Sequence, residues 1–333
     1  MLITKPEFFD TFRCIAGSCS DSCCKEWDVQ VDAVSAQYYR SLTGALGDRL
    51  REVLYDEDGE VYMAIEDGRC PMWRRDGLCR IQAELGEGAL CKTCREFPRL
   101  THDYGDFIEY GLELSCPEAA RIIFANPDAR LVTREVPGGE EPEYDTEAMD
   151  SLLSSRQVML SLLADKSRPI GETLALALLY GYQAQGELDG EEVLPFDEEA
   201  ALATIRQLAK TGNIQEIVDF FKGLEILTPH WQQRLDAPAP ADFPQELRIL
   251  ARYMVERYWL QAVSDYDLSC RVKFILIACL LVNALGGDTV STAQLFSKEI
   301  ENSAQNVDAI LDAAYTSPAF TDDKLLGLLL DLK

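Results

Sequence analysis

The sequence has few histidines and few basic residues, and each shortage excludes a class of function. Only two histidines, His102 and His230, occur among 333 residues, and neither stands in a Ser-His-Asp or Cys-His pattern of a hydrolase. Lys and Arg together number 31 against 57 Asp and Glu, which gives a net charge of −26. Such a field repels polyanions, so we expect no nucleic-acid partner. A basic, lysine-bearing protein would be attracted.

A membrane-spanning segment and a signal peptide are also missing from the pattern. The first ten residues carry Lys5, Glu7 and Asp10 and have no apolar core. The longest uncharged apolar run, Phe274 to Gly287, is shorter than the roughly 20 residues of a membrane helix. We therefore expect a soluble, cytoplasmic protein with no membrane partner. Its cysteines should be reduced thiols rather than disulfides.

Cysteine is abundant, and its distribution is uneven. Nine of the 11 cysteines lie between Cys14 and Cys116, whereas Cys270 and Cys279 lie in an apolar helical stretch that predicts buried thiols. The nine read Cys14-x4-Cys19-x3-Cys23-Cys24, then Cys70-Pro, Cys79, Cys91-x2-Cys94 and Cys116-Pro. Short spacings let thiolates converge, and a bound metal removes their mutual repulsion and supplies folding energy. The pattern predicts a cysteine-ligated metal centre.

The cysteine spacing indicates the presence of a metal more sharply than it indicates which metal is bound. The odd count and the missing secretion signal disfavour disulfides. Zinc is the serious rival, but zinc modules usually have paired C-x2-C knuckles, and only Cys91 and Cys94 have that form. The recurring Cys-Pro favours iron–sulfur. Because the neighbouring side chains of Cys23 and Cys24 point in different directions, either one of them lies outside the ligand set or there are two centres.

Four segments resemble the CxxCxxCC family of zinc- or iron-chelating proteins, and within it the flagellin lysine-N-methylases. They are FRCIAGSCSDSCCKEWDVQVD (12–32), CPMWRRDGLCRIQAELG (70–86), CKTCREFPR (91–99) and LSCPEAARII (114–123). The resemblance implies a methyltransferase that uses S-adenosylmethionine and a [4Fe-4S] cluster to methylate lysines of flagellin or another lysine-bearing protein. Carried over by position, the implied metal ligands are Cys14, Cys19, Cys23, Cys24, Cys70, Cys79, Cys94 and Cys116. Cys91 departs from the family pattern. A non-catalytic zinc- or iron-binding module and an electron-transfer protein are the alternatives.

Methyl transfer to lysine requires a neutral amine, whereas free lysine has a pKa of about 10.4. We predict proton or radical relays among Tyr104, Asp106 and Tyr110, with Glu109 beside them, on a strand between cysteine motifs. His102 is expected to be exposed in a loop. No glycine-rich strand–turn–helix motif indicates a Rossmann-type nucleotide site.

A locally basic segment, Arg69 to Arg99, stands out in this acidic chain. Guanidinium groups there would stabilise an anionic cluster or bind a carboxylate-bearing cofactor, with Arg80, Arg95 and Arg99 as the candidates. A solvated helix face is the alternative interpretation.

The predicted fold is mainly α, with a small α+β cysteine-rich N-terminal metal domain and a C-terminal helical domain. The boundaries are 1–126 for the metal domain, 127–145 for an acidic linker and 146–333 for the all-helical domain. Helices are predicted at 146–164, 170–185, 197–211, 214–224, 243–263, 268–285, 292–303, 307–315 and 322–332, starting at caps such as Asp197 and Ser291-Thr292. Leu268 to Leu285 is apolar almost all round and should be the central buried helix. Residues 1–126 carry 14 basic and 23 acidic side chains, and residues 127–333 carry 17 and 34.

Overall fold

The computed structural model describes residues 1–25, 29–240 and 244–332, and it is mostly helical with small sheets. This confirms the expectation of a mainly α protein. One sheet has the strand order β5-β6-β1-β7. Its strands are β1 (Leu2–Pro6), β5 (Arg99–Asp103), β6 (Phe107–Leu112) and β7 (Leu131–Glu135). Strand β1 pairs parallel to β6 and antiparallel to β7, so the first residues of the chain lie inside this sheet.

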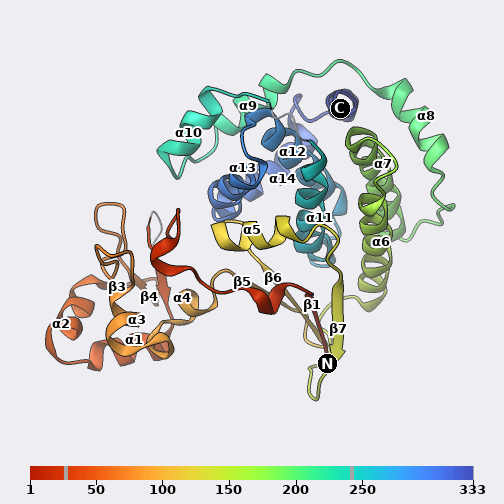
Figure 1. The fold of residues 1–333 in the computed structure, drawn as a ribbon. Coiled ribbons are helices and arrows are strands. Elements are labelled where there is room, and N and C mark those ends of the chain that lie inside the picture. Colours follow the sequence, from red (N-terminus) through yellow and green to blue (C-terminus); the bar gives the residue numbers. More distant parts are fainter. Residues whose placement is uncertain (26–28, 241–243, 333) are drawn as a thin grey trace.

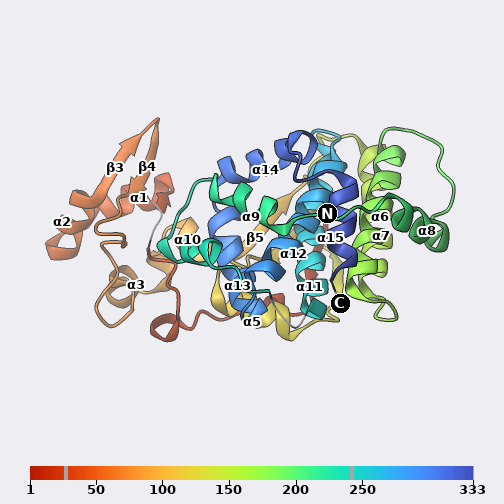
Figure 2. The same cartoon turned by 90° about the horizontal axis from the view of Figure 1, so that it is seen from above.

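A small module stands at one end of the molecule and comprises residues 29–97 (Figures 1 and 2). Its sheet has the order β2-β4-β3, formed by β2 (Val29–Val31), β3 (Leu54–Glu57) and β4 (Glu60–Met63). Its helices are α1 (Ala33–Ser41), α2 (Gly44–Val53), α3 (Arg80–Leu85) and α4 (Lys92–Glu96). The module has its own buried cluster, which includes Tyr39, Leu50, Met72 and Ile81.

The helical body holds a second and much larger buried cluster. It contains the four-stranded sheet and α5 (Pro117–Ala125), α6 (Thr146–Ala164), α7 (Ile170–Leu188), α8 (Glu198–Leu208), α9 (Ile214–Lys222), α10 (Pro229–Asp236), α11 (Leu247–Tyr258), α12 (Leu268–Leu285), α13 (Thr289–Phe296), α14 (Ala304–Thr316) and α15 (Asp322–Leu330). Short helices of other types are η1 (Phe9–Thr11), η2 (Ala16–Ser18), η3 (Glu87–Ala89), η4 (Pro244–Glu246), η5 (Trp259–Val263) and the π-helix η6 (Ser297–Glu301).

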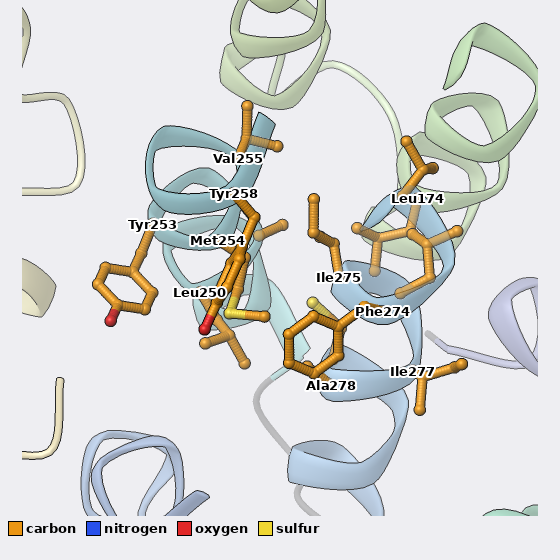
Figure 3. Packing of buried hydrophobic residues seen from close by; sticks show 14 of the residues in the cluster. Leu174, Leu250, Tyr253, Met254, Val255, Tyr258, Phe274, Ile275, Ile277 and Ala278 are labelled. Atoms are coloured by element: carbon orange, nitrogen blue, oxygen red, sulfur yellow. The ribbon is translucent and has the colours of Figure 1, made fainter. Parts of the chain in front are cut away.

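Helix α12 is the centre of the body, as its all-round apolar sequence predicts. Phe274, Ile275 and Ala278 on this helix face Leu250 and Met254 of α11 (Figure 3). The helix is long and apolar enough to cross a membrane, but 94% of it is buried inside the fold. Its burial explains its composition as that of a core helix.

The predicted helices agree with the structure in most of their bounds. Two of them, α6 and α12, begin and end where the sequence predicts, and Asp197 caps α8 through the N–H groups of Glu199 and Ala200. The expected Ser291-Thr292 start is wrong, because Asp288 caps α13 three residues earlier. The sequence reading missed α10, which Thr228 caps and Pro229 starts. The expected helix start at Phe243 lies outside the described residues.

The first 126 residues contribute to both buried clusters. Phe8, Phe12, Phe107 and the residues of α5 pack into the cluster of the helical body, whereas residues 29–97 form the module. The stretch predicted as an acidic linker contains strand β7, which pairs with β1 along five residues. The chain therefore starts in the helical body, leaves it to form the module, and returns to it before the helices of the body begin.

Candidate metal centre

One cavity of about 350 Å³ is lined by all nine cysteines of the N-terminal cluster. The sequence brings these thiols from positions 14 to 116, and the fold gathers them where the small module meets the helical body. Tyr39 and Met72 of the module line one side, and Phe12 and Lys298 of the body line another. The volume lies in the range of sites that hold a small ligand or cofactor. The eight predicted ligands and Cys91 are therefore neighbours in space.

Five of the cysteines belong to the module wall. Cys70 and Cys91 are part of the buried cluster of the module, and Cys24 and Cys79 pack against it. The backbone N–H of Cys70 donates to the carbonyl oxygen of Cys24 at 2.7 Å. Cys94 lies on α4, whose Thr93 hydroxyl donates to the carbonyl oxygen of Gln30 on β2 at 2.8 Å. These contacts fix the five thiols to one small hydrophobic core.

Other cysteines belong to the body wall. Cys116 is buried in the body cluster and is the residue just before α5, and Cys14 follows the buried Phe12 by two residues. The thiol of Cys19 donates to the carbonyl oxygen of Asp21 at 3.2 Å. The loop that bears Cys14 and Cys19 therefore starts at the core of the helical body, at Phe12.

Asp21 anchors this loop to the helical body. Its carboxylate accepts from Lys298 Nζ at 3.0 and 3.1 Å and from Gln294 Nε2 at 3.1 Å. The same Gln294 amide donates to the carbonyl oxygen of Ser115 at 2.7 Å, next to Cys116. Burial raises the pKa of Asp21, but Lys25 and Lys298 outweigh it and hold that pKa below its usual range.

Gly17 permits the close approach of this loop to the module. A Cβ on Gly17 would lie 3.0 Å from the carbonyl oxygen of Asp76, and one on Gly77 would lie 3.1 Å from Gly17 Cα. Gly77 also has a φ of +81°, which favours glycine. Both glycines let two backbones touch, so that Leu78 and Cys79 line the same cavity as Cys14.

The protonation of the thiols shows how much a cation would change the site. Burial raises the pKa of Cys70 to about 12 and that of Cys116 to about 11, so both thiols are neutral at pH 7 without a metal. Adjacent thiols share protons: the hydrogen bond from Cys23 lowers the pKa of Cys24 to about 7 while the pKa of Cys23 rises. A bound cation would favour the thiolate at each position.

Among the described residues, no group of three or more His, Cys, Asp or Glu side chains is arranged to hold a single metal ion. A [4Fe-4S] cluster makes a different demand, because its thiolates bind separate irons and do not meet at one point. Such a cluster requires four soft thiolate donors, and nine cysteines around one cavity supply more than that number. The chemistry of the lining thus fits a cluster.

Positive side chains also lie on the cavity. Of the three predicted arginines, Arg95 and Arg99 line it, and Arg99 stacks over the Phe12 ring at 5.1 Å. Arg80 does not line it, and its Nε binds Glu84 at 2.7 Å on the surface. The sequence reading missed Arg13 and Lys298, which also line the cavity. Lys298 comes from η6 near the end of the chain, so no local pattern could have indicated it.

The predicted relay residues lie elsewhere. Tyr104 stacks on Phe107 at 4.6 Å, and Asp106 accepts a hydrogen bond from the Tyr144 hydroxyl at 2.6 Å. Tyr110 lies on β6 and packs on Phe9. None of the three predicted residues is among the described residues that line the cysteine cavity. The predicted strand is a pair of strands, with Tyr104 and Asp106 in the turn between them.

The expectation that His102 lies exposed in a loop is wrong. His102 is on β5 opposite Glu109, and its Nε2 is buried with no hydrogen-bond partner among the described residues. Burial and the nearby charge of Arg257 lower its pKa. With Glu109, Tyr110 and Glu256 it lines a separate cavity of about 40 Å³, large enough for a water molecule.

Comparison with known proteins gives the family. The flagellar biosynthetic protein FliU of Salmonella muenchen is 34% identical over 137 residues, which cover 38% of this chain and 79% of FliU. The chain belongs to the family of FliU and the lysine-N-methylases. Lysine-N-methylases of Salmonella typhimurium and Salmonella choleraesuis are each 32% identical over 143 residues, 40% of this chain. The match spans 35% of the length of each of these two methylases. No protein-family model matches the chain, and no solved structure matches it.

Proposed function

We propose that this protein is a cytoplasmic, iron–sulfur and S-adenosylmethionine-dependent protein-lysine N-methyltransferase that modifies flagellin. One observation carries the proposal: nine cysteines and two of the three predicted arginines line a single cavity in a chain that is related to lysine-N-methylases. Thiolates support a cluster, and guanidinium groups support a carboxylate-bearing cofactor. The acidic surface supports a basic, lysine-bearing substrate.

Different residues of the chain would have different roles in this reaction. The cysteines would hold the cluster, which supplies an iron site for the amino and carboxylate groups of S-adenosylmethionine. Arg95 and Arg99 are on the cavity wall and would pair with the carboxylate of that cofactor. The apolar side chains of Met72, Leu90 and Ile81 on the module side would exclude water from the methyl group. A desolvated site favours the neutral amine that accepts the methyl group.

Mass spectrometry of flagellin tests the proposal. Co-expression of the protein with flagellin should add about 14 Da per methyl group to lysines, the mass of one CH₂ unit that replaces a hydrogen. A protein with Arg95→Gln and Arg99→Gln should bind S-adenosylmethionine more weakly and methylate less, whereas Arg80→Gln is the matched control with its charge already paired to Glu84. Unmodified flagellin with the metal-loaded wild-type protein would refute the proposal.

A second candidate function is a non-catalytic metal-binding module that serves flagellar biosynthesis. One observation favours it: the match covers 79% of FliU, whose name describes no catalytic activity, but only 35% of the methylases. Binding of flagellin without methylation would support this candidate, and binding of S-adenosylmethionine by the metal-loaded protein would count against it.

A further inference from the structure

The charged side chains on the cysteine cavity are unequal in sign. Among the described residues, the cationic ones on its wall are Arg13, Lys25, Arg95, Arg99 and Lys298, and the carboxylates are Asp21, Glu87 and Glu118. The excess of positive charge suits the anionic groups that the proposed function places in the cavity. A lysine side chain, with a pKa of about 10.4, reaches the cavity at pH 7 as an ammonium ion. It therefore needs one of these carboxylates as its partner.

Two of the three carboxylates are poorly suited to receive that ammonium ion. Asp21 is already paired with Lys25 at 2.8 Å and with Lys298 at 3.0 Å, so a third cation would gain little there. Glu87 lies on η3 of the module and is exposed, and water and salt screen the charge of an exposed side chain. The wall of the helical body supplies the remaining carboxylate.

Glu118 combines a place on the cavity with a partner outside it. It lies in the first turn of α5, and its side chain is 13% exposed. Its carboxylate accepts from Nε and Nη2 of Arg121 at 2.8 and 2.7 Å. Arg121 is 63% exposed and is not among the described residues that line the cavity. Because an ion pair with such an exposed partner contributes little, an ammonium ion in the cavity can take the place of Arg121 at small cost.

We propose that Glu118 receives the ammonium group of the substrate lysine at the cysteine cavity. The inference rests on the proposed function for the class of substrate and adds the residue that recognises it. No covalent bond forms or breaks in this step: the carboxylate holds the ammonium group by charge and hydrogen bonds, and Arg121 turns to solvent. An uncharged side chain of the same length would not be held.

Binding of purified flagellin to the metal-loaded full chain tests the role of Glu118. Glu118→Gln should bind flagellin about tenfold more weakly, the effect of one lost charged hydrogen bond, whereas Glu118→Asp keeps the charge and should retain most of the affinity. Arg121→Gln is the matched control and should bind at least as tightly as the wild type, because it removes only the competing cation. If the ion pair merely stabilised α5, Glu118→Gln and Arg121→Gln would weaken binding equally, and that result would overturn the inference.

Flagellin with acetylated lysines gives a second measurement, because acetylation removes the positive charge. The difference in affinity between unmodified and acetylated flagellin should be about tenfold smaller for Glu118→Gln than for the wild type. Equal affinity of the wild type for both forms would overturn the inference, as would a loss of binding in Glu87→Gln but not in Glu118→Gln. The measurements on the wild type and Arg121→Gln remain decisive if circular dichroism shows that Glu118→Gln does not fold.

The methylation assay separates this inference from the proposed function. Binding that depends on Glu118 but leaves flagellin unmethylated would refute the proposed function alone. Methylation by Glu118→Gln with an unchanged KM for flagellin would overturn the role of Glu118 alone.

Discussion

Replacement of Asp21 by Asn should loosen the cysteine loop from the helical body. The carboxylate pairs with Lys25 at 2.8 Å and with Lys298 at 3.0 Å, and its side chain is only 21% exposed. Charged hydrogen bonds contribute about 1.5–3 kcal/mol each, and solvent screening reduces this at a half-buried site. We expect Asp21→Asn to cost about 2 kcal/mol in the free energy of unfolding at pH 7.

Urea denaturation of the metal-free protein measures that cost, and alkylation of Cys19 measures local opening. Asp10→Asn is the control, because Asp10 pairs with Lys5 but is 71% exposed, and such pairs contribute little. The pKa of Asp21 is lowered in the folded state, so its contribution is present above the unfolded pKa of about 3.8 and is lost as the pH falls through the folded value. A cost equal to that of Asp10→Asn, or one that persists at low pH, would refute the anchoring role.

Three further predictions concern the buried charges and the metal. Glu109→Gln should lower the free energy of unfolding by about 3–5 kcal/mol, because it leaves the buried Arg156 guanidinium, bonded at 2.6 and 2.7 Å, without its charge partner. Addition of Arg156→Met should recover most of this stability in denaturant unfolding, and no recovery would contradict the pairing. Burial raises the pKa of Glu256 from 4.5 to about 7, so the wild type loses stability as the pH rises between these values. The free energy of unfolding of Glu256→Gln should therefore rise by on the order of 3 kcal/mol relative to that of the wild type between pH 4 and pH 8. A difference between the two proteins that does not change with pH would count against this prediction. Removal of metal by a chelator should make the module, residues 29–97, the first part that a protease cleaves, whereas simultaneous cleavage of the helical body would show that the metal stabilises both equally.

Local patterns were sufficient for the bounds of two helices. Capping residues and apolar periodicity set the bounds of α6 and α12, since both signals lie within the helix itself or at its first residue. Local patterns could not specify the four-stranded sheet, because β1 pairs with β6 more than 100 residues later and no local signal identifies that partner. The same limit explains β7: its five residues lie between segments rich in Pro, Gly and acidic side chains, and they become a strand by pairing with β1.

The cysteines were found from spacing, but their division between two cores was not. Clustering along the sequence indicates that thiols converge, yet the wall to which each thiol belongs depends on tertiary packing. Cys91 shows the difference: it departs from the family pattern, and the fold buries it on the module wall beside the predicted ligand Cys94. Tyr104 and Asp106 show the opposite case. They precede a cysteine motif in the sequence, but the fold places them in the turn between β5 and β6 of the four-stranded sheet.

The position of the cysteines at a junction gives metal binding a mechanical consequence. The module and the body have separate cores, and the cysteine loop reaches both through Gly17 on one side and Asp21 on the other. A cluster bound by thiols of both walls would order that loop and hold Cys24, whose carbonyl oxygen accepts from the Cys70 N–H, to the small core. Such a cluster would fix the distance between module and body, and therefore the width of the cavity that would receive the cofactor.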